Sequence, residues 1–308
     1  MTANTAILIA AYNAEATLER AVASALAQPE AVEICIVDDR STDATVSVAR
    51  HLAARDMRVR VIELPTNSGP SSARNAAIAA TKAPWLAILD ADDYLLEGRL
   101  AAIHAHTPGA DFIADALMRT HEGREPDAPE TPFTPTQLTF REFVLGNLGA
   151  RTGPLDLGFL KPVFRRSFIE TNALRYKERM RLGEDYLFYA HALAKGARFM
   201  VGGAAGYVSV ERPGSLSKDH SEADLEMLRD CDDELAGVRS LTPMERRALW
   251  RHWTSVDCRL QWRRLISAVK ARNPGAALRT FHTPQAALYL AARLGEQAWL
   301  RSVGRALG

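Results

Sequence analysis

Residues 32–43 read VEICIVDDRSTD, an apolar run that ends in a group of acidic and hydroxyl side chains. The apolar run predicts a buried strand over Val32–Val37, and the polar group predicts a turn before a helix over Ala44–Ala54. The same alternation predicts strands over Ala6–Ala11, Val59–Leu64 and Trp85–Leu89 and helices over Ala16–Ala27 and Ser71–Thr81. Strands that alternate with helices are joined by right-handed crossovers into a mostly parallel sheet. We therefore predict an α/β fold with helices flanking the sheet.

The second half of the chain mixes loops, helices and strands. The run Arg119–Thr136 carries four prolines among polar residues and is predicted to be a loop. After it we expect helices over Thr139–Leu145 and Glu184–Ala194, strands over Arg198–Val201 and Gly206–Val210, and two or three helices from Glu222 onward. This pattern predicts a main domain over residues 1–220 and a helical C-terminal region over residues 221–308.

The composition is that of a soluble globular protein, with 47% of the 308 residues hydrophobic and 24% charged. Apolar runs such as Thr5–Tyr12 and Ala83–Leu89 are far shorter than the roughly 20 residues that cross a bilayer. No secretory signal is recognised before Thr5. Three scattered cysteines are too few for a disulfide framework or a thiolate metal site, which favours a reducing compartment. We therefore expect a cytoplasmic location.

The net charge of +1 hides an uneven distribution. Residues 238–308 hold thirteen Lys or Arg against three Asp or Glu, a net charge of +10, whereas residues 1–237 have a net charge of −9. Within the basic segment Leu249, Trp253, Val256 and Leu260 recur at helical spacing, with arginines between them. This stripe either packs on its own domain or lies on an anionic membrane surface. The charge favours peripheral membrane contact through the C-terminal helices.

Acidic side chains are concentrated where the fourth predicted strand ends, at Asp90-Ala91-Asp92-Asp93. Open parallel sheets bind ligands at the carboxyl ends of their strands. Three carboxylates this close repel one another unless a cation lies among them, and Mg²⁺ and Mn²⁺ prefer oxygen ligands. The alternative is that Asp93 caps a following helix while Asp90 and Asp92 are solvated turn residues.

The loop at Asp38-Asp39 also has two interpretations. Asp39 can accept a hydrogen bond from a uracil imide or a ribose hydroxyl, with Tyr12 stacked on the base. Alternatively, the two aspartates form a turn, and Tyr12 is an ordinary half-buried aromatic residue. No strand-end loop contains the glycine-rich pattern of a dinucleotide fold or a P-loop. An NAD-dependent enzyme or an ATPase therefore lacks its main sequence support.

Taken in order, five motifs resemble the family 2 glycosyltransferases of the GT-A fold: Tyr12-Asn13, Asp38-Asp39-Arg40-Ser41-Thr42-Asp43, Asn67-Ser68-Gly69 with Ala73-Arg74-Asn75, Asp90-Ala91-Asp92-Asp93, and Gly183-Glu184-Asp185. The resemblance covers residues 6–99 densely and residues 158–220 more sparsely. It implies a nucleotide-sugar half over about residues 1–117 and an acceptor half over about residues 137–220. The chain looks most similar to succinoglycan-type glucosyltransferases that build bacterial exopolysaccharide.

The resemblance also implies a role for each donor-site residue. Tyr12 and Asp39 hold the uracil and ribose, and Asn13 follows Tyr12 in the same loop. Arg74 lies near the nucleotide, and Asp90 contacts the ribose and sugar. The ions expected on the diphosphate are Mn²⁺ or Mg²⁺, held by Asp92 and Asp93. The Asp38–Asp43 motif departs from the family pattern at Arg40, where the family usually has glycine. This difference matters if residue 40 has a positive φ.

On the acceptor side the resemblance implies that Asp185 is the general base and that Glu184 orients the acceptor. The structural alternative is that both carboxylates are stabilised by the dipole at a helix N-terminus. A later polar loop makes Arg212, Ser217 and His220 candidate contacts to phosphate or metal. Its alternative is a plain turn with a surface histidine.

These residues together imply inverting transfer of a hexose, first of all glucose, from a UDP-sugar. The expected acceptor is a saccharide, in particular a lipid-linked repeat unit, and no nucleic-acid partner is expected. Two alternatives are a non-catalytic nucleotide-sugar binding protein and a nucleotidyltransferase. The first is disfavoured by Asp185, and the second by the absence of a glycine-rich basic loop after the first strand.

Overall fold

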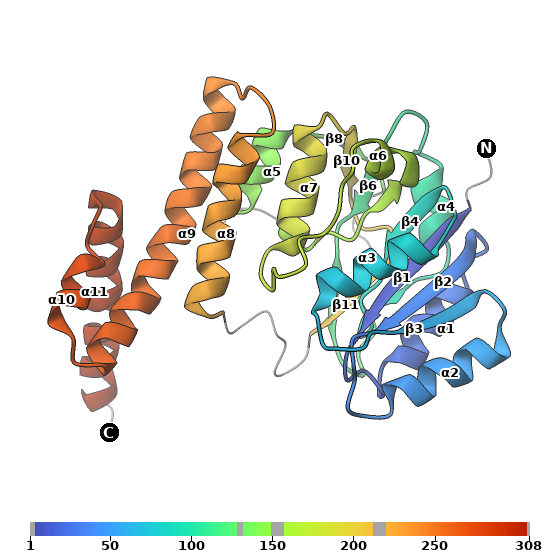
Figure 1. The fold of residues 1–308 in the computed structure, drawn as a ribbon, viewed down its shortest axis with the longest axis horizontal. Helices are drawn as coiled ribbons and strands as arrows, with labels where there is room; N and C mark the ends of the chain where they lie inside the picture. The colour runs from blue at the N-terminus through green and yellow to red at the C-terminus, as the bar shows by residue number, and fades with distance from the viewer. Residues whose placement is uncertain (1–3, 128–131, 149–156, 212–219, 307–308) are drawn as a thin grey trace. The chain divides into compact units, whose positions relative to one another are not determined.

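The computed structural model describes residues 4–127, 132–148, 157–211 and 220–306 (Figure 1). The chain divides into two compact units, Met1–Leu216 and Ser217–Gly308. The first unit is an α/β structure, and the second is helical. Arg212 and Ser217 lie outside the described residues.

The first unit is built on an eight-stranded sheet. In spatial order its strands are β3 (Val59–Glu63), β2 (Ala31–Asp38), β1 (Thr5–Ala11), β4 (Trp85–Ile88), β9 (Val163–Arg165), β6 (Phe112–Asp115), β10 (Phe199–Gly202) and β8 (Thr136–Leu138). The first four strands are parallel, as predicted. β9 is antiparallel to both of its neighbours, and β8 is antiparallel to β10. The carboxyl ends of β1, β2, β3 and β4 therefore meet at one edge.

A three-stranded sheet completes the unit. Its order is β5 (Tyr94–Leu95), β11 (Tyr207–Glu211) and β7 (Met118–His121). The prediction of a loop from Arg119 was wrong for its first three residues, which belong to β7. Met118 and Thr120 are buried while Arg119 and His121 are exposed, the alternation of a strand that pairs with β11.

Helices flank the larger sheet. They are α1 (Leu18–Leu26), α2 (Thr45–Arg55), α3 (Pro70–Ala80), α4 (Arg99–His104), α5 (Phe140–Gly146), α6 (Arg166–Thr171) and α7 (Glu184–Ala194), with a short 3₁₀ turn at Leu157–Phe159. Figure 1 shows α3 in front of the sheet, and it contacts β1 and β2. An aromatic cluster of Phe112, Phe164, Phe188, Tyr189 and Phe199 joins α7 to β6, β9 and β10. Since these rings are buried, they hold the start of α7 in a fixed position.

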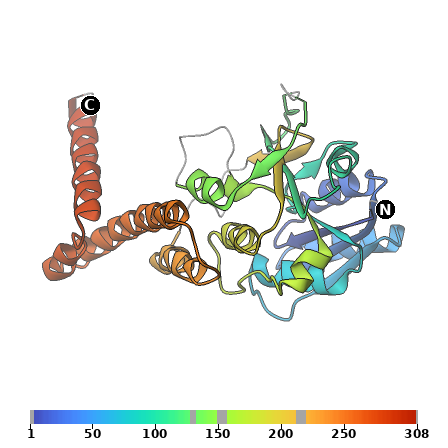
Figure 2. The same cartoon turned by 90° about the horizontal axis from the view of Figure 1, so that it is seen from above.

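The second unit contains α8 (Glu222–Ala236), α9 (Pro243–Lys270), α10 (Pro274–Arg279) and α11 (Pro284–Ala306). α8 packs on α9, and α11 follows the end of α9 through α10 (Figure 2). In the expected membrane stripe Leu249, Val256 and Leu260 are buried, which favours the alternative that this stripe packs on other helices. None of the described helices combines the length and apolar character needed to span a membrane.

Candidate functional site

Asp39 anchors the start of α3. Its Oδ1 accepts a hydrogen bond from the backbone N–H of Ser68 at 2.7 Å, and its Oδ2 accepts one from Gly69 at 2.7 Å. Gly69 has a φ of 88°, a conformation that glycine adopts without steric cost. Asn67 donates its side-chain N–H to the backbone oxygen of Asp39. The carboxylate expected to read the nucleoside therefore also fixes the loop after β3.

A polar cavity of about 380 Å³ opens beside this anchor. Its lining residues come from the loop after β3, from α3 and from the segment before α7: Asn67, Ser68, Ser72, Glu178, Arg179 and Arg181. Because amide, hydroxyl and guanidinium groups line it, the cavity suits a ligand that makes hydrogen bonds. It connects the expected donor side of the site with the segment that leads to Asp185.

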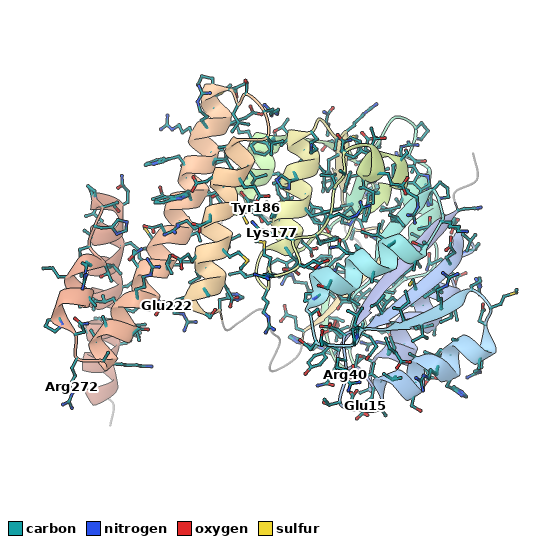
Figure 3. The ribbon with its side chains drawn as sticks, in the orientation of Figure 1. Glu15, Arg40, Lys177, Tyr186, Glu222 and Arg272 are labelled. Carbon is teal, nitrogen blue, oxygen red and sulfur yellow. The ribbon has the colours of Figure 1, made fainter. Side chains whose placement is uncertain are left out.

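Asn13 ties the loops after β1 and β2 together. Its backbone N–H donates to Ser41 Oγ at 3.0 Å, and its Oδ1 accepts from the backbone N–H of Thr42 at 2.9 Å. Arg40 has a φ of 65°, so this departure from the expected glycine lies in the left-handed region, where the Cβ atom of an L residue is crowded. Figure 3 shows Arg40 and Glu15 at this end of the sheet. Tyr12, at 46% exposure, presents a ring on which a base can stack.

The chemical centre of the unit is a closed ring of two cations and two carboxylates. Arg74 donates from Nη2 to Asp90 Oδ1 at 3.0 Å and from Nη1 to Asp185 Oδ1 at 3.1 Å. Lys161 Nζ lies 2.8 Å from Asp90 Oδ2 and 2.9 Å from Asp185 Oδ2. Glu184 Oε1 also accepts from Arg74 Nη1, at 3.1 Å. Arg74, Lys161 and Asp185 are buried.

The ring controls the charges of its members. Burial raises the pKa of Asp90, but the charges of Lys161 and Arg74 outweigh burial and hold that pKa below its usual range. Burial likewise lowers the pKa of Lys161, and the nearby Asp185 and Asp90 outweigh it, so that the pKa lies above its usual range. Asp90 and Lys161 are therefore charged at neutral pH.

Asp93 is engaged in hydrogen bonds within the protein. Tyr207 Oη donates to its Oδ2 at 2.9 Å, and the backbone N–H of Val210 donates to its Oδ1 at 2.9 Å. Burial, followed by the charges of Asp90 and Asp92, raises the pKa of Asp93 to about 7. The residue does not cap a helix, because β5 follows it. Asp92, by contrast, is exposed.

The donor set fits a divalent ion that takes most of its ligands from a substrate. Within the described ranges, no group of three His, Cys, Asp or Glu side chains converges as a metal site. Mg²⁺ is commonly held by one or two carboxylates together with substrate phosphates, and the exposed Asp92 would supply such a ligand. His220 belongs to the second unit and lies before α8.

Sequence reasoning missed Lys161, Tyr207 and Val210. Lys161 is the single charged residue within the apolar run LGFLKPVF at residues 157–164, a signal that could have singled it out. Its partners are not evident from the sequence, because they depend on the pairing of β9 with β4. Tyr207 and Val210 reach Asp93 only through the three-stranded sheet.

Comparisons with known proteins identify the family of this chain. The family described as Glycosyl transferase family 2 matches residues 6–171, more than half of the chain. The chain belongs to glycosyltransferase family 2. It is 40% identical over 293 residues to the succinoglycan biosynthesis protein ExoU of Rhizobium meliloti (strain 1021), covering 92% of this chain and 84% of ExoU. It is also 40% identical over 230 residues to ExoO of that strain, covering 70% of this chain and 64% of ExoO.

Solved structures show the same fold. The Staphylococcus aureus protein TarS, residues 1–349 in complex with UDP-GlcNAc, matches with a TM-score of 0.64 at 19% identity over 90% of each chain. The mannosyltransferase PcManGT of Pyrobaculum calidifontis, in complex with GDP-Man and Mn²⁺, matches with a TM-score of 0.56 at 18% identity, covering 99% of this chain and 80% of PcManGT. The prediction of a GT-A glycosyltransferase is confirmed.

Proposed function

We propose that this glycosyltransferase is a metal-dependent inverting enzyme that moves a hexose, first of all glucose, from a UDP-sugar to a saccharide acceptor. The observation that carries the proposal is the ring itself. Asp90, at the end of β4, and Asp185, at the start of α7, share Arg74 and Lys161 as partners. The same two cations therefore hold Asp90, which is expected at the donor, and Asp185, which is the expected base.

Asp185 is suited to remove a proton from the acceptor hydroxyl. Each of its oxygens accepts one hydrogen bond from the ring, and a carboxylate oxygen has a second acceptor site. As the proton moves to Asp185, the hydroxyl oxygen forms a bond to the anomeric carbon. The bond from that carbon to the diphosphate breaks on the opposite side, which inverts the configuration. The transition state is oxocarbenium-like.

The remaining residues bind and orient the donor. Tyr12 stacks on the uracil, and Asp39 fixes the loop that surrounds the nucleoside. Asp92 is the proposed ligand of Mn²⁺ or Mg²⁺, an ion that stabilises the negative charge on the departing diphosphate. We further propose that the acceptor is a lipid-linked repeat unit, since two relatives are named as succinoglycan biosynthesis proteins.

A panel of nucleotide sugars with Mn²⁺, scored for release of nucleoside diphosphate by slow hydrolysis, tests the proposal without an acceptor. We expect UDP-glucose to give the fastest release. Tight binding of UDP-sugars without any release would favour the non-catalytic binder. Pyrophosphate release from UTP and a sugar phosphate would instead favour a nucleotidyltransferase.

The metal assignment predicts a specific loss of nucleotide affinity. Asp92→Ala is expected to abolish the tightening of UDP binding by Mn²⁺, because the ion then loses its protein ligand. Calorimetry with and without Mn²⁺ measures this, and Asp127→Ala, which changes another exposed-loop carboxylate, serves as the control. Equal UDP affinity for the wild type and Asp92→Ala under both conditions would contradict the assignment.

For the second unit we propose contact with an anionic bilayer, where a lipid-linked acceptor is found, through a surface other than the stripe expected from the sequence. Residues 258–295 contain seven Lys or Arg and no Asp or Glu. Val269, Leu278 and Leu288 are exposed by 63%, 75% and 74%. No residue of α10 is buried. Figure 3 shows Arg272 pointing away from the helices, so exposed cations accompany the exposed apolar side chains.

Binding to vesicles tests this surface. The full chain is expected to sediment with anionic vesicles at low salt and to be released at high salt, because the attraction is screened beyond about a Debye length. Lys270→Ala with Arg272→Ala should weaken binding. Arg247→Ala with Arg251→Ala, which removes the same charge near the other end of α9, should not. No sedimentation of the wild type, or equal losses for both pairs, would refute the proposal.

A further inference from the structure

Lys161 is brought to the site by an antiparallel strand pair. β9 pairs with β4 in a register that sets Val163 opposite Ala87. Two residues before Val163, Lys161 therefore lies beside the end of β4, where the chain continues to Asp90. The pairing places a lysine from a distant part of the sequence at the edge of the parallel sheet.

The backbone around Lys161 is anchored independently of its side chain. Its carbonyl oxygen accepts from Nη2 of the buried Arg99 at 2.8 Å, and Arg99 is in turn paired with Asp115 at 2.7 Å. The preceding carbonyl, of Leu160, accepts from Tyr189 Oη of α7 at 3.0 Å. Because the backbone is held from both sides, the ammonium group has a defined position between the two carboxylates.

The charge balance of the site depends on this one ammonium group. Asp90, Glu184 and Asp185 contact Arg74, whose two terminal nitrogens are shared among all three. Lys161 supplies the second cation, and its side chain is 7% exposed. Without it, three carboxylates would face a single guanidinium in a buried place, where like charges repel strongly.

We propose that Lys161 is a positioning residue that couples the donor loop to the base. The inference rests on the proposed function. One Nζ contacts Asp90 on the donor side and Asp185 on the acceptor side, so a change at Asp90 when the donor binds alters the contact at Asp185. Arg74 also contacts both carboxylates, but through separate nitrogens and while holding Glu184, whereas Lys161 joins them through one atom. Lys161 therefore makes the position of the Asp185 carboxylate depend on the contacts that Asp90 makes in the donor loop.

Kinetics of Lys161→Met test the coupling. We expect the kcat of transfer to fall by roughly 10-fold or more, with a much smaller change in UDP affinity. The other groups that face Asp185 are Arg74 of α3, Glu184 and Tyr189 of α7, and Tyr176, and all remain in this variant. Lys195→Met, at the exposed end of α7, is the matched control.

A second measurement makes the outcome independent of activity. We compare the melting temperatures of Lys161→Met, Asp185→Asn and the double variant. The melting temperature of the double variant should fall by less than the sum of the two single decreases. If Lys161→Met fails to fold, Lys161→Gln takes its place in both measurements. A wild-type kcat, or strictly additive losses of melting temperature, would overturn the proposal. If the wild type releases no UDP but the losses of melting temperature are non-additive, the proposed function is contradicted. The interaction between Lys161 and Asp185 is then still supported.

Discussion

Replacing Asp185 with asparagine is expected to lower the kcat of transfer by roughly 10²-fold or more, with UDP affinity close to that of the wild type. The amide is similar in size to the carboxylate, but it cannot take the proton of the acceptor hydroxyl. Donor affinity is retained because Asp39, Tyr12 and Asp92 are untouched. Steady-state kinetics with the best donor of the panel, together with calorimetry, measure both quantities.

The control for this prediction is Asp233→Asn, which changes an exposed carboxylate of α8. It should leave the rate unchanged. Glu184→Gln is expected to have a smaller effect than Asp185→Asn, because Glu184 contacts Arg74 and not Lys161. Transfer at the wild-type rate by Asp185→Asn would show that another group, or water, accepts the proton.

Loss of the buried Arg99 should destabilise the first unit by about 3–5 kcal/mol. Arg99 is fully buried and donates from two nitrogens to Asp115 Oδ1, at 3.1 and 2.7 Å. The variant Arg99→Met leaves Asp115 charged and unpaired by any cation in a place from which water is excluded. The Lys161 carbonyl also loses a donor. Urea denaturation of the full chain, followed by a probe of the first unit, measures the change.

Arg50→Met provides the comparison for this effect. Its ion pair with Glu63 has a similar length, 2.6 Å, but the two side chains are 67% and 42% exposed. Solvent screening limits the contribution of such a pair to the free energy of unfolding to about 1 kcal/mol or less. Similar losses of stability for Arg99→Met and Arg50→Met would contradict the view that the buried pair holds the sheet and the lysine together.

The sequence was sufficient for the part of the fold with strong local signals. β1 to β4 and α1 to α3 alternate regularly, and their bounds differ from the expected ones by a few residues at most. The acidic and polar loops fall at the carboxyl ends of these strands, so the residues expected at the donor were found together at one edge. Arg74, Asp90 and Asp185 are in direct contact through the ring, although they are far apart in sequence.

Other parts depend on pairings that leave little trace in the sequence. β5, β6, β7, β8 and β9 have two to four residues each, too few for a periodic pattern to identify. The short β9 brings Lys161 to Asp90, and the pair β11 and β5 brings Tyr207 to Asp93. In the second unit, composition identified a basic helical segment, but which apolar residues face solvent depends on how α10 and α11 pack on α9.

We propose that Asp185, held by Arg74 and Lys161, promotes a single inverting displacement on a UDP-sugar. Proton NMR of the first sugar released from UDP-glucose by slow hydrolysis in the presence of Mg²⁺ tests this mechanism. UDP-glucose carries an α-linked sugar, so one displacement by an activated water predicts that β-glucose appears first and then equilibrates. If α-glucose appears first, the displacement does not invert, and the role assigned to Asp185 is contradicted.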